Sequence, residues 1–427
     1  MRFTAAGDML TQRRLVEYDG LDELSRYIGQ GDARYFNLET TLNNEGECFG
    51  SAFNGGSYPR ADPRTLDDCR RYGFNMLSFC NNHTMDYSYD GLVKTLEHIE
   101  ASDFIQAGVG RNLSAAAAPA YLETPKGRVA LIGFVSTCDP SMLAGEQSRR
   151  VKGRPGVNQL RFKQTIIVNR EDMEAIQRIA ANTHINAETE IVRAEGYRPD
   201  VPEGYFEFGN LMFRLGDEPM RETKCNPDDL KRMEKAVYEA SMNADYILVA
   251  IHSHEISGAS KESPSQFLQE FAHACIDAGA DAVIGHGPHL LRPVEIYGGR
   301  PIFYSLGDFV MENESIPFGP EDFFVKYGLS SDATMHELFR TRSRDFTRGL
   351  QTKRVMFETV IPYWEMEGKT LTHLELMPVE LGFDLQRSLK GRPHIAKDDA
   401  IVRRLAAMSE PFGTRMRFEG NRAIVEL

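Results

Sequence analysis

Apolar runs of strand length alternate with segments of helical periodicity over residues 1–135. The strand-like runs lie near 2–7, 34–39, 74–80, 103–107, 120–124 and 128–135. The helical segments lie near 20–29, 63–72 and 90–101, and Asp90 is a natural N-cap for the last of them. Such alternation is typical of βαβ units, so we expect an α/β protein with a mainly parallel sheet.

Residues 137–225 interrupt this rhythm. They are rich in charge, Gly and Pro, and they contain a single helical pattern near 170–182, so we interpret them as an insertion between sheet strands. Alternation then resumes, with Asn226-Pro227 as the start of a helix. The later elements are helices near 227–243, 264–278 and 398–409, strands near 245–251, 281–285, 354–362 and 370–378, and a hairpin of 292–297 with 301–306. Residues 312–350 are irregular and polar, and could cover a site as a lid.

Polar side chains follow five of the apolar runs, at the point where each strand should end. These residues are Asp8, Asn37, Glu39, Asn82, His83, His252, His254, His286 and His289. Because the carboxyl ends of parallel strands meet at one edge of a sheet, where ligands bind, we expect these groups to converge. Carboxylates, an amide and imidazoles together are ligands for Zn, Mn, Fe, Co or Ni. The sequence therefore predicts a divalent metal site.

Two metal ions about 3.5–4 Å apart need a bridging carboxylate and several terminal ligands. Asp8 and Glu39 supply the anionic charge, with Glu39 the better bridge, and Asn82 could supply a neutral oxygen. His83 could act as a general acid oriented by Asp86, three residues further on.

The histidines occur in pairs. His252 and His254 point to the same face of an extended strand, and His286 and His289 flank a rigid Gly-Pro turn. Two nearby acids, Glu255 and Asp308, can be read either as members of the site or as structural groups. The remaining histidines that lack such a context are interpreted as structural; they are His98, His184, His273 and His336.

Composition and charge exclude some classes of function. The chain has 427 residues and a formal net charge of -13, which disfavours binding to nucleic acid or to anionic membranes. No window reaches the ~18 consecutive apolar residues of a transmembrane helix, and no signal peptide is recognised, so we expect a cytoplasmic protein without membrane insertion. The six cysteines are scattered and suggest reduced core thiols. The oligomeric state stays open.

Several segments resemble the CapA (poly-γ-glutamate capsule biosynthesis) family, which is similar to the calcineurin-like metallophosphoesterases. They are Ala6–Met9, Asn37–Glu39, Asn81–Asp86, Gly108–Asn112, Gly285–His289 and Tyr304–Phe309. The resemblance implies a single domain over 1–427, a four-layer α/β/β/α sandwich of metallophosphoesterase type with an inserted segment and a dinuclear metal site. It assigns Asp8 and His289 to the first metal and Glu39 to the bridge. It assigns Asn82, His252 and His286 to the second metal, and makes His83 the group that protonates leaving groups.

The chain departs from the family pattern at several positions. The superfamily has Asp-x-His where this chain has Asp8-Met9-Leu10, so one customary ligand is missing. His254 could replace it or act as a base. The family commonly has His-Trp-Gly at 252–254 and Asn at 308, and many capsule members carry an N-terminal membrane anchor that we do not recognise here.

Three functions fit these observations. The first is a metal-dependent hydrolase acting on a phosphoester or on a peptide or γ-glutamyl amide, with a small-molecule or peptide substrate. The second is a metal-dependent peptide Cα-epimerase, in which His83 and either His254 or Glu255 exchange the α-proton from opposite faces. The third is a non-enzymatic accessory protein of poly-γ-glutamate capsule synthesis.

Overall fold

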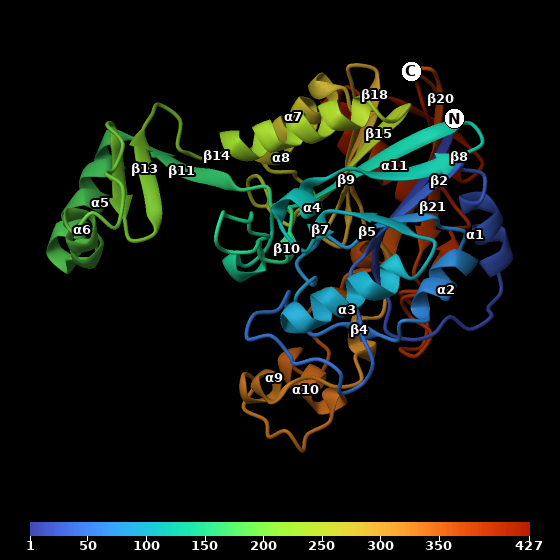
Figure 1. Cartoon of the computed structure of the whole chain (residues 1–427), viewed down its shortest axis with the longest axis horizontal. Coiled ribbons are helices and arrows are strands. Elements are labelled where there is room, and N and C mark those ends of the chain that lie inside the picture. The colour runs from blue at the N-terminus through green and yellow to red at the C-terminus, as the bar shows by residue number, and fades with distance from the viewer.

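The computed structural model describes residues 1–427 and contains two large β-sheets (Figure 1). The ten-stranded sheet has the order β23 (Met416–Glu419), β24 (Arg422–Val425), β21 (Thr370–Glu380), β20 (Glu358–Glu367), β1 (Arg2–Leu10), β2 (Ala33–Leu38), β5 (Met76–Ser78) and β6 (Ile105–Ala107), with β19 (Asp308–Met311) beside β1 and β22 (His394–Ile395) beside β21. Strands β1, β2, β5 and β6 are parallel, whereas β20 and β21 are antiparallel.

The six-stranded sheet contains most of the strands expected in the second half of the chain. Its order is β17 (Leu291–Tyr297), β18 (Arg300–Leu306), β16 (Ala282–His286), β15 (Tyr246–His252), β9 (Gly127–Val135) and β8 (Ala120–Thr124). The four central strands are parallel, and β17 and β8 are antiparallel edges. The mixed α/β architecture predicted from the sequence is confirmed.

The two sheets pack face to face. Successive residues of a strand point to opposite faces of its sheet, and in the central strands both faces are apolar, so one face packs against the other sheet and one against helices. In β2, Tyr35 belongs to the core between the sheets, and Phe36 belongs to the core beneath the helices. In β9, Leu131 faces the inter-sheet core and Ile132 faces outward. Helix α11 (Ala400–Ser409) closes one border of the inter-sheet core.

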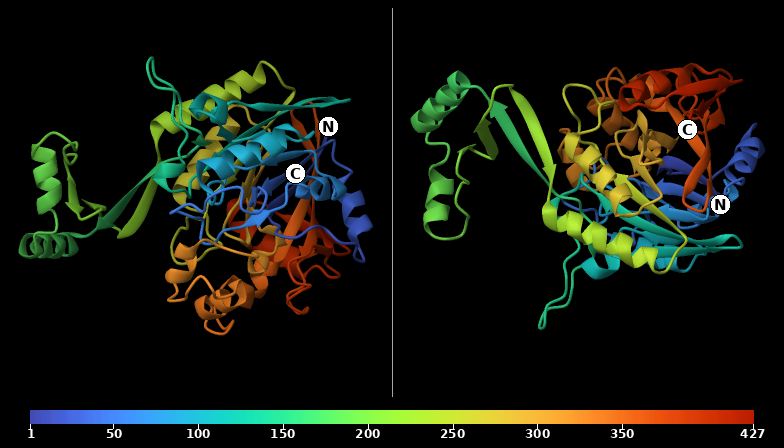
Figure 2. Two further views of the ribbon diagram at one scale, coloured as in Figure 1. Left: turned by 60° about the horizontal axis from the view of Figure 1, so that its bottom comes forward. Right: turned by 90° about the horizontal axis from the view of Figure 1, so that it is seen from above.

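Helices cover the outer face of each sheet (Figures 1 and 2). Those on the ten-stranded sheet are α1 (Leu21–Ile28), α2 (Thr65–Arg71) and α3 (Ser88–Glu100); those on the six-stranded sheet are α7 (Pro227–Ser241) and α8 (Gln266–Ala278). Asn226 caps α7, as expected, by accepting hydrogen bonds from the main-chain N–H groups of Asp228 and Asp229. Asp90 is not the cap of α3, because the helix begins two residues earlier; it lies in the first turn, where a carboxylate favours the helix dipole.

Strands β11 (Phe162–Val168) and β14 (Met220–Cys225) form an antiparallel ribbon that leads away from the two sheets (Figures 1 and 2). The far end consists of β12 (Tyr205–Phe208), β13 (Leu211–Leu215), α5 (Arg170–Thr183) and α6 (Ala187–Ala194). Helix α5 matches the helical pattern seen in the sequence. The sequence pattern missed α6, which buries none of its residues.

Residues 312–350 are less irregular than the sequence suggests. They contain α9 (Glu321–Val325) and α10 (Met335–Arg342), and α10 starts with a capping box between Thr334 and Glu337. Both helices bury aromatic residues against Tyr58 and Tyr87. None of the helices in the chain combines the length and the apolar character needed to cross a membrane.

Candidate metal centre

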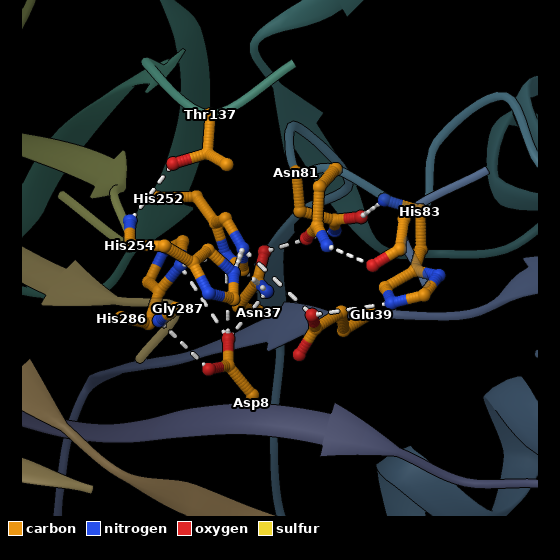
Figure 3. A network of polar contacts seen from close by, with 12 residues as sticks. Asp8, Asn37, Glu39, Asn81, His83, Thr137, His252, His254, His286 and Gly287 are labelled. Atoms are coloured by element: carbon orange, nitrogen blue, oxygen red, sulfur yellow. Dashed lines mark hydrogen bonds and ion pairs between the residues drawn. The ribbon is translucent and has the colours of Figure 1, made fainter. Parts of the chain in front are cut away.

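The registers of the parallel strands bring the sequence-predicted polar residues together. In the six-stranded sheet, His252 at the end of β15 is the register partner of His286 at the end of β16. In the ten-stranded sheet, Asp8 of β1 is opposite both Asn37 of β2 and Asp308 of β19. The centre therefore forms where the strand ends of the two sheets meet (Figure 3).

Asp8 links the two sheets. Its Oδ1 lies 3.6 Å from His252 Nδ1 and 3.5 Å from His286 Nδ1, and it accepts a 2.7 Å hydrogen bond from Asn37 Nδ2 (Figure 3). Its Oδ2 accepts a 2.8 Å hydrogen bond from the main-chain N–H of Gly287. Every one of these groups is buried, so the carboxylate is held rigidly at the junction.

Two glycines permit this close approach. A Cβ on Gly7 would overlap the carbonyl oxygen of Gly307, which explains why a residue without a side chain precedes Asp8. Gly287 has a φ of 124°, and a Cβ there would come 2.9 Å from the main-chain nitrogen of Ser253. The turn after β16 thus packs directly on the segment that carries His252 and His254.

Metal-ligand atoms cluster in three overlapping groups, each with all its donor atoms within 4.8 Å of one another. The groups are Asp8 with His252 and His286; Glu39 with His254 and His289; and Asp8 with Glu39, His289 and Asp308. Asp8, Glu39 and His289 each belong to two groups. His254 lies with Glu39 and His289 in the second group.

Several buried oxygens of the predicted site residues have no hydrogen-bond partner in the protein. They are both carboxylate oxygens of Glu39, Oδ1 of Asn82 and Oδ2 of Asp308. Buried carboxylates are costly unless they are paired or coordinate a metal ion. Nitrogen and oxygen donors with free lone pairs, packed at this distance, fit divalent metal ions, and the residues present therefore suit the group that the family resemblance implies.

The electrostatics of the two carboxylates differ. Burial alone would raise the pKa of Asp8, but its hydrogen bond to His252 and the charges of His252 and His286 lower it below the usual range. Burial raises the pKa of Glu39 well above its usual value, and the charges of Asp8 and Asp308 raise it further. Burial lowers the pKa of His286 to about 3, so its imidazole is neutral and able to donate a lone pair.

His289 and Asp308 form a buried pair, with Nδ1 and Oδ1 2.9 Å apart. Burial lowers the pKa of His289, but the charge and hydrogen bond of Asp308 outweigh this and raise it. Burial raises the pKa of Asp308 to about 6, against the opposing effect of His289. His289 also has a left-handed φ of 62°, a conformation uncommon for residues other than glycine and frequent at functional sites.

His83 approaches the cluster from the loop after β5. Its Nδ1 lies 2.5 Å from Asp86 Oδ2, and its Nε2 lies 3.8 Å from Glu39 Oε1. The main-chain N–H of His83 donates to Asn81 Oδ1, and Asn81 Nδ2 donates to the carbonyl of Leu38, which ties the loop to β2 (Figure 3). The ring is thereby oriented with one nitrogen toward Asp86 and the other toward the metal ligands.

The two acids that the sequence left ambiguous lie in different environments. Asp308 belongs to a donor group, whereas Glu255 is outside all three and accepts hydrogen bonds from the hydroxyls of Ser136, Thr137 and Ser253. Sequence reasoning missed Tyr35, whose hydroxyl lies 2.9 Å from His286 Nε2. Tyr35 sits in the middle of a strand, where no sequence signal distinguishes it from a core residue.

Comparison with known proteins finds one matching family and several relatives. The family described as "Bacterial capsule synthesis protein PGA_cap" matches residues 2–313. The protein y4sH of Sinorhizobium fredii, described as uncharacterized, is 30% identical over 99% of this chain and 92% of its own length. "Capsule biosynthesis protein CapA" of Bacillus anthracis is 24% identical over 73% of this chain and 60% of its own. "Probable polyglutamine synthesis accessory protein MT0602" of Mycobacterium tuberculosis is 26% identical over 67% of this chain and 57% of its own.

Proposed function

Because this chain belongs to the bacterial capsule synthesis family PGA_cap, we propose that it is a metal-dependent hydrolase with a dinuclear site. Its substrate would carry a phosphoester or a peptide or γ-glutamyl amide. The observation that carries the proposal is the set of buried, unpartnered carboxylate oxygens on Glu39 and Asp308 within a cluster of histidine and carboxylate donors. The names of the relatives in capsule and polyglutamine synthesis make an amide substrate reasonable.

The proposal extends to the fold. The paired sheets with helices on both outer faces support a four-layer α/β/β/α sandwich of metallophosphoesterase type. Within one such domain over 1–427, residues 137–225 would be an insertion and residues 312–350 a lid. The packing of α9 and α10 against Tyr58 and Tyr87, close to Asp86, supports the lid.

Two donor sets would hold the metal ions. Asp8, His252 and His286 form one set, to which Asn82 could add a neutral oxygen; Glu39, His254 and His289 form the other. Bound divalent ions would supply Lewis-acid activation of the carbonyl or phosphoryl group that is attacked. In this arrangement His254 is a ligand that compensates for the leucine at position 10.

His83 would protonate the leaving group. The Asp86 carboxylate, 2.5 Å from Nδ1, would accept a hydrogen bond from Nδ1–H and fix the orientation of the ring, so that the imidazolium form could give up its other proton from Nε2. Nε2 faces the ligand cluster, 3.8 Å from Glu39, so a scissile bond bound over the cluster would lie within its reach. Asp86 therefore acts on the reaction through the position of His83.

The test combines metal content with turnover. The purified protein should contain about two equivalents of Mn, Zn, Fe or Co and should hydrolyse generic phosphodiesters or γ-glutamyl peptides; chelation should abolish this activity. His254→Ala should lower the metal content to about one equivalent if His254 is a ligand. Stoichiometric metal without turnover of either substrate class would contradict the hydrolase.

Epimerisation at a peptide Cα is a second candidate, favoured by one observation. His83 and His254 reach the Glu39 cluster from different sheets, His83 after β5 and His254 after β15, as two bases on opposite faces of a substrate would. One would remove the α-proton while the other returns a proton to the opposite face. Deuterium incorporation from heavy water into an uncleaved peptide would support this activity, and cleavage without incorporation would exclude it.

A non-enzymatic accessory role is the third candidate, and the name of the M. tuberculosis relative, an accessory protein, favours it. It predicts that substitution of Glu39 by Gln leaves the biological function of the protein intact. A metal-replete protein whose function is lost in the Glu39→Gln variant would argue against it.

A further inference from the structure

A cavity of about 510 Å³ lies beside Lys261, between α10 and the residues that follow it. Its volume falls in the range of about 300–1,000 Å³ that is usual for ligand pockets. Four cationic side chains line it: Lys261, Arg342, Arg348 and Lys353. The one acidic lining residue, Glu314, is already engaged by another arginine at 2.6 Å. The cavity is therefore strongly basic within a chain whose net charge is -13.

The four cations have no ion-pair partner, in contrast to Arg340 and Arg354, which flank three of them in the sequence. Arg340 pairs with Asp345 at 2.6 Å, and Arg354 pairs with Asp384 at 2.5 Å, whereas no carboxylate lies within ion-pair distance of the cations lining the cavity. Gathering unpaired like charges around a cavity costs electrostatic free energy. Such an arrangement is favourable when an anion binds between the charges.

The cavity is joined to the metal centre by a buried arginine. Arg292 is fully buried, and its Nε donates a 2.9 Å hydrogen bond to the carbonyl of Lys261. The same guanidinium donates to the carbonyls of Ser253, His254 and Glu255. One wall of the cavity is thus fastened to the segment that carries His254.

A second lining residue, Asn313, is connected to the loop that carries His83. Asn313 lines the cavity and accepts a 3.1 Å hydrogen bond from the hydroxyl of Ser57. Two residues before Ser57, the main-chain N–H of Gly55 donates to Asp86 Oδ1 at 2.9 Å. The cavity lining is therefore connected by hydrogen bonds to both segments that we assign to the chemistry, the one that carries His254 and the loop that carries His83.

We propose that this cavity is a subsite that binds an anionic group of the substrate, a carboxylate or a phosphate, away from the bond that reacts. Guanidinium groups bind both anions through paired, charge-assisted hydrogen bonds. The family match ends at residue 313, and three of the four cations lie beyond it, so most of the charge of the subsite comes from the part of the chain outside that match. This inference rests on the proposed function, since it concerns the substrate of the same centre.

Binding to the full-length protein under chelation tests the subsite separately from catalysis. The probes are triglutamate, its neutral counterpart triglutamine, and inorganic phosphate, each titrated calorimetrically at low and high salt. We expect triglutamate or phosphate to bind in a salt-dependent manner and triglutamine not to bind. The probe that binds identifies the anion as carboxylate or phosphate.

The double variant Arg342→Gln/Arg348→Gln should weaken anion binding by about tenfold or more, because two charge-assisted contacts are lost. Arg344→Gln is the matched control, since Arg344 is an exposed arginine of the same segment that does not line the cavity. Unchanged affinity in the double variant, or equal binding of triglutamate and triglutamine, would overturn the proposal. Because these titrations are done without metal, their outcome does not depend on whether the metal-loaded protein is a hydrolase.

Discussion

Substitution of Glu39 by Gln should have opposite effects on the metal-free and metal-loaded protein. The Glu39 carboxylate is fully buried, neither oxygen has a hydrogen-bond partner, and its pKa is raised well above its usual value by burial and by the nearby charges of Asp8 and Asp308. Without metal, this carboxylate destabilises the fold at neutral pH. With metal, it becomes a ligand that stabilises it.

The Gln side chain stays buried and unpartnered but carries no charge, so the gain is the excess cost of the charged group over a neutral one, on the order of 1–3 kcal/mol. An unfolding entropy of about 2.1 cal/mol/K per residue amounts to about 0.9 kcal/mol/K for 427 residues. The metal-free Glu39→Gln variant should therefore melt about 1–3 °C above metal-free wild type. A metal ion at a concentration a hundred times its Kd raises the free energy of unfolding of the wild type by about 2.7 kcal/mol, which raises Tm by about 3 °C. The variant should lose most of this gain.

Differential scanning calorimetry of both proteins, with chelator and with each candidate metal, measures the crossover. The buried structural substitution Asp229→Asn is the control, because Asp229 lies outside the ligand cluster and should lower Tm with and without metal. If metal-free Glu39→Gln melts below metal-free wild type, Glu39 has a structural role and the reasoning fails.

Three further outcomes are expected. His83→Gln should lower turnover by about 10²–10⁴-fold while leaving the metal content unchanged. The control His273→Gln should leave turnover unchanged, because His273 pairs with Glu295 away from the cluster. Equal losses of turnover in the two variants would refute the acid role of His83. Gly55→Ala should reduce turnover, since its Cβ would come 2.7 Å from His83 Nδ1; wild-type kinetics would show that the loop adjusts freely. Burial opposes the ionisation of Asp229, but hydrogen bonds from Arg161 lower its pKa. Asp229→Asn should therefore lower the free energy of unfolding by about 1.5–3 kcal/mol at pH 7, and by progressively less as the pH falls below about 4. A loss that does not change with pH in urea unfolding would contradict this.

Much of the architecture follows from local patterns. Alternating apolar runs and amphipathic segments identified nearly all strands of the two sheets, because burial of one strand face or helix stripe leaves a period in the sequence. The polar residues at strand ends were recognisable for the same reason, since Asp8, His252 and His286 each follow a buried run. Helix α6, which buries none of its residues, was missed, and the start of α3 was placed two residues too late, at Asp90.

Sequence alone established which residues could bind metal, and the tertiary structure decided how they are grouped. The pairing of Asp8 with His252 and His286 depends on strand register and on the packing of one sheet against the other, and neither is encoded in local periodicity. The same holds for the basic cavity, whose cations come from residues 261 and 342–353 and meet only because the chain folds back. Contacts between residues distant in sequence are set by the whole core, and no short segment of the chain specifies them.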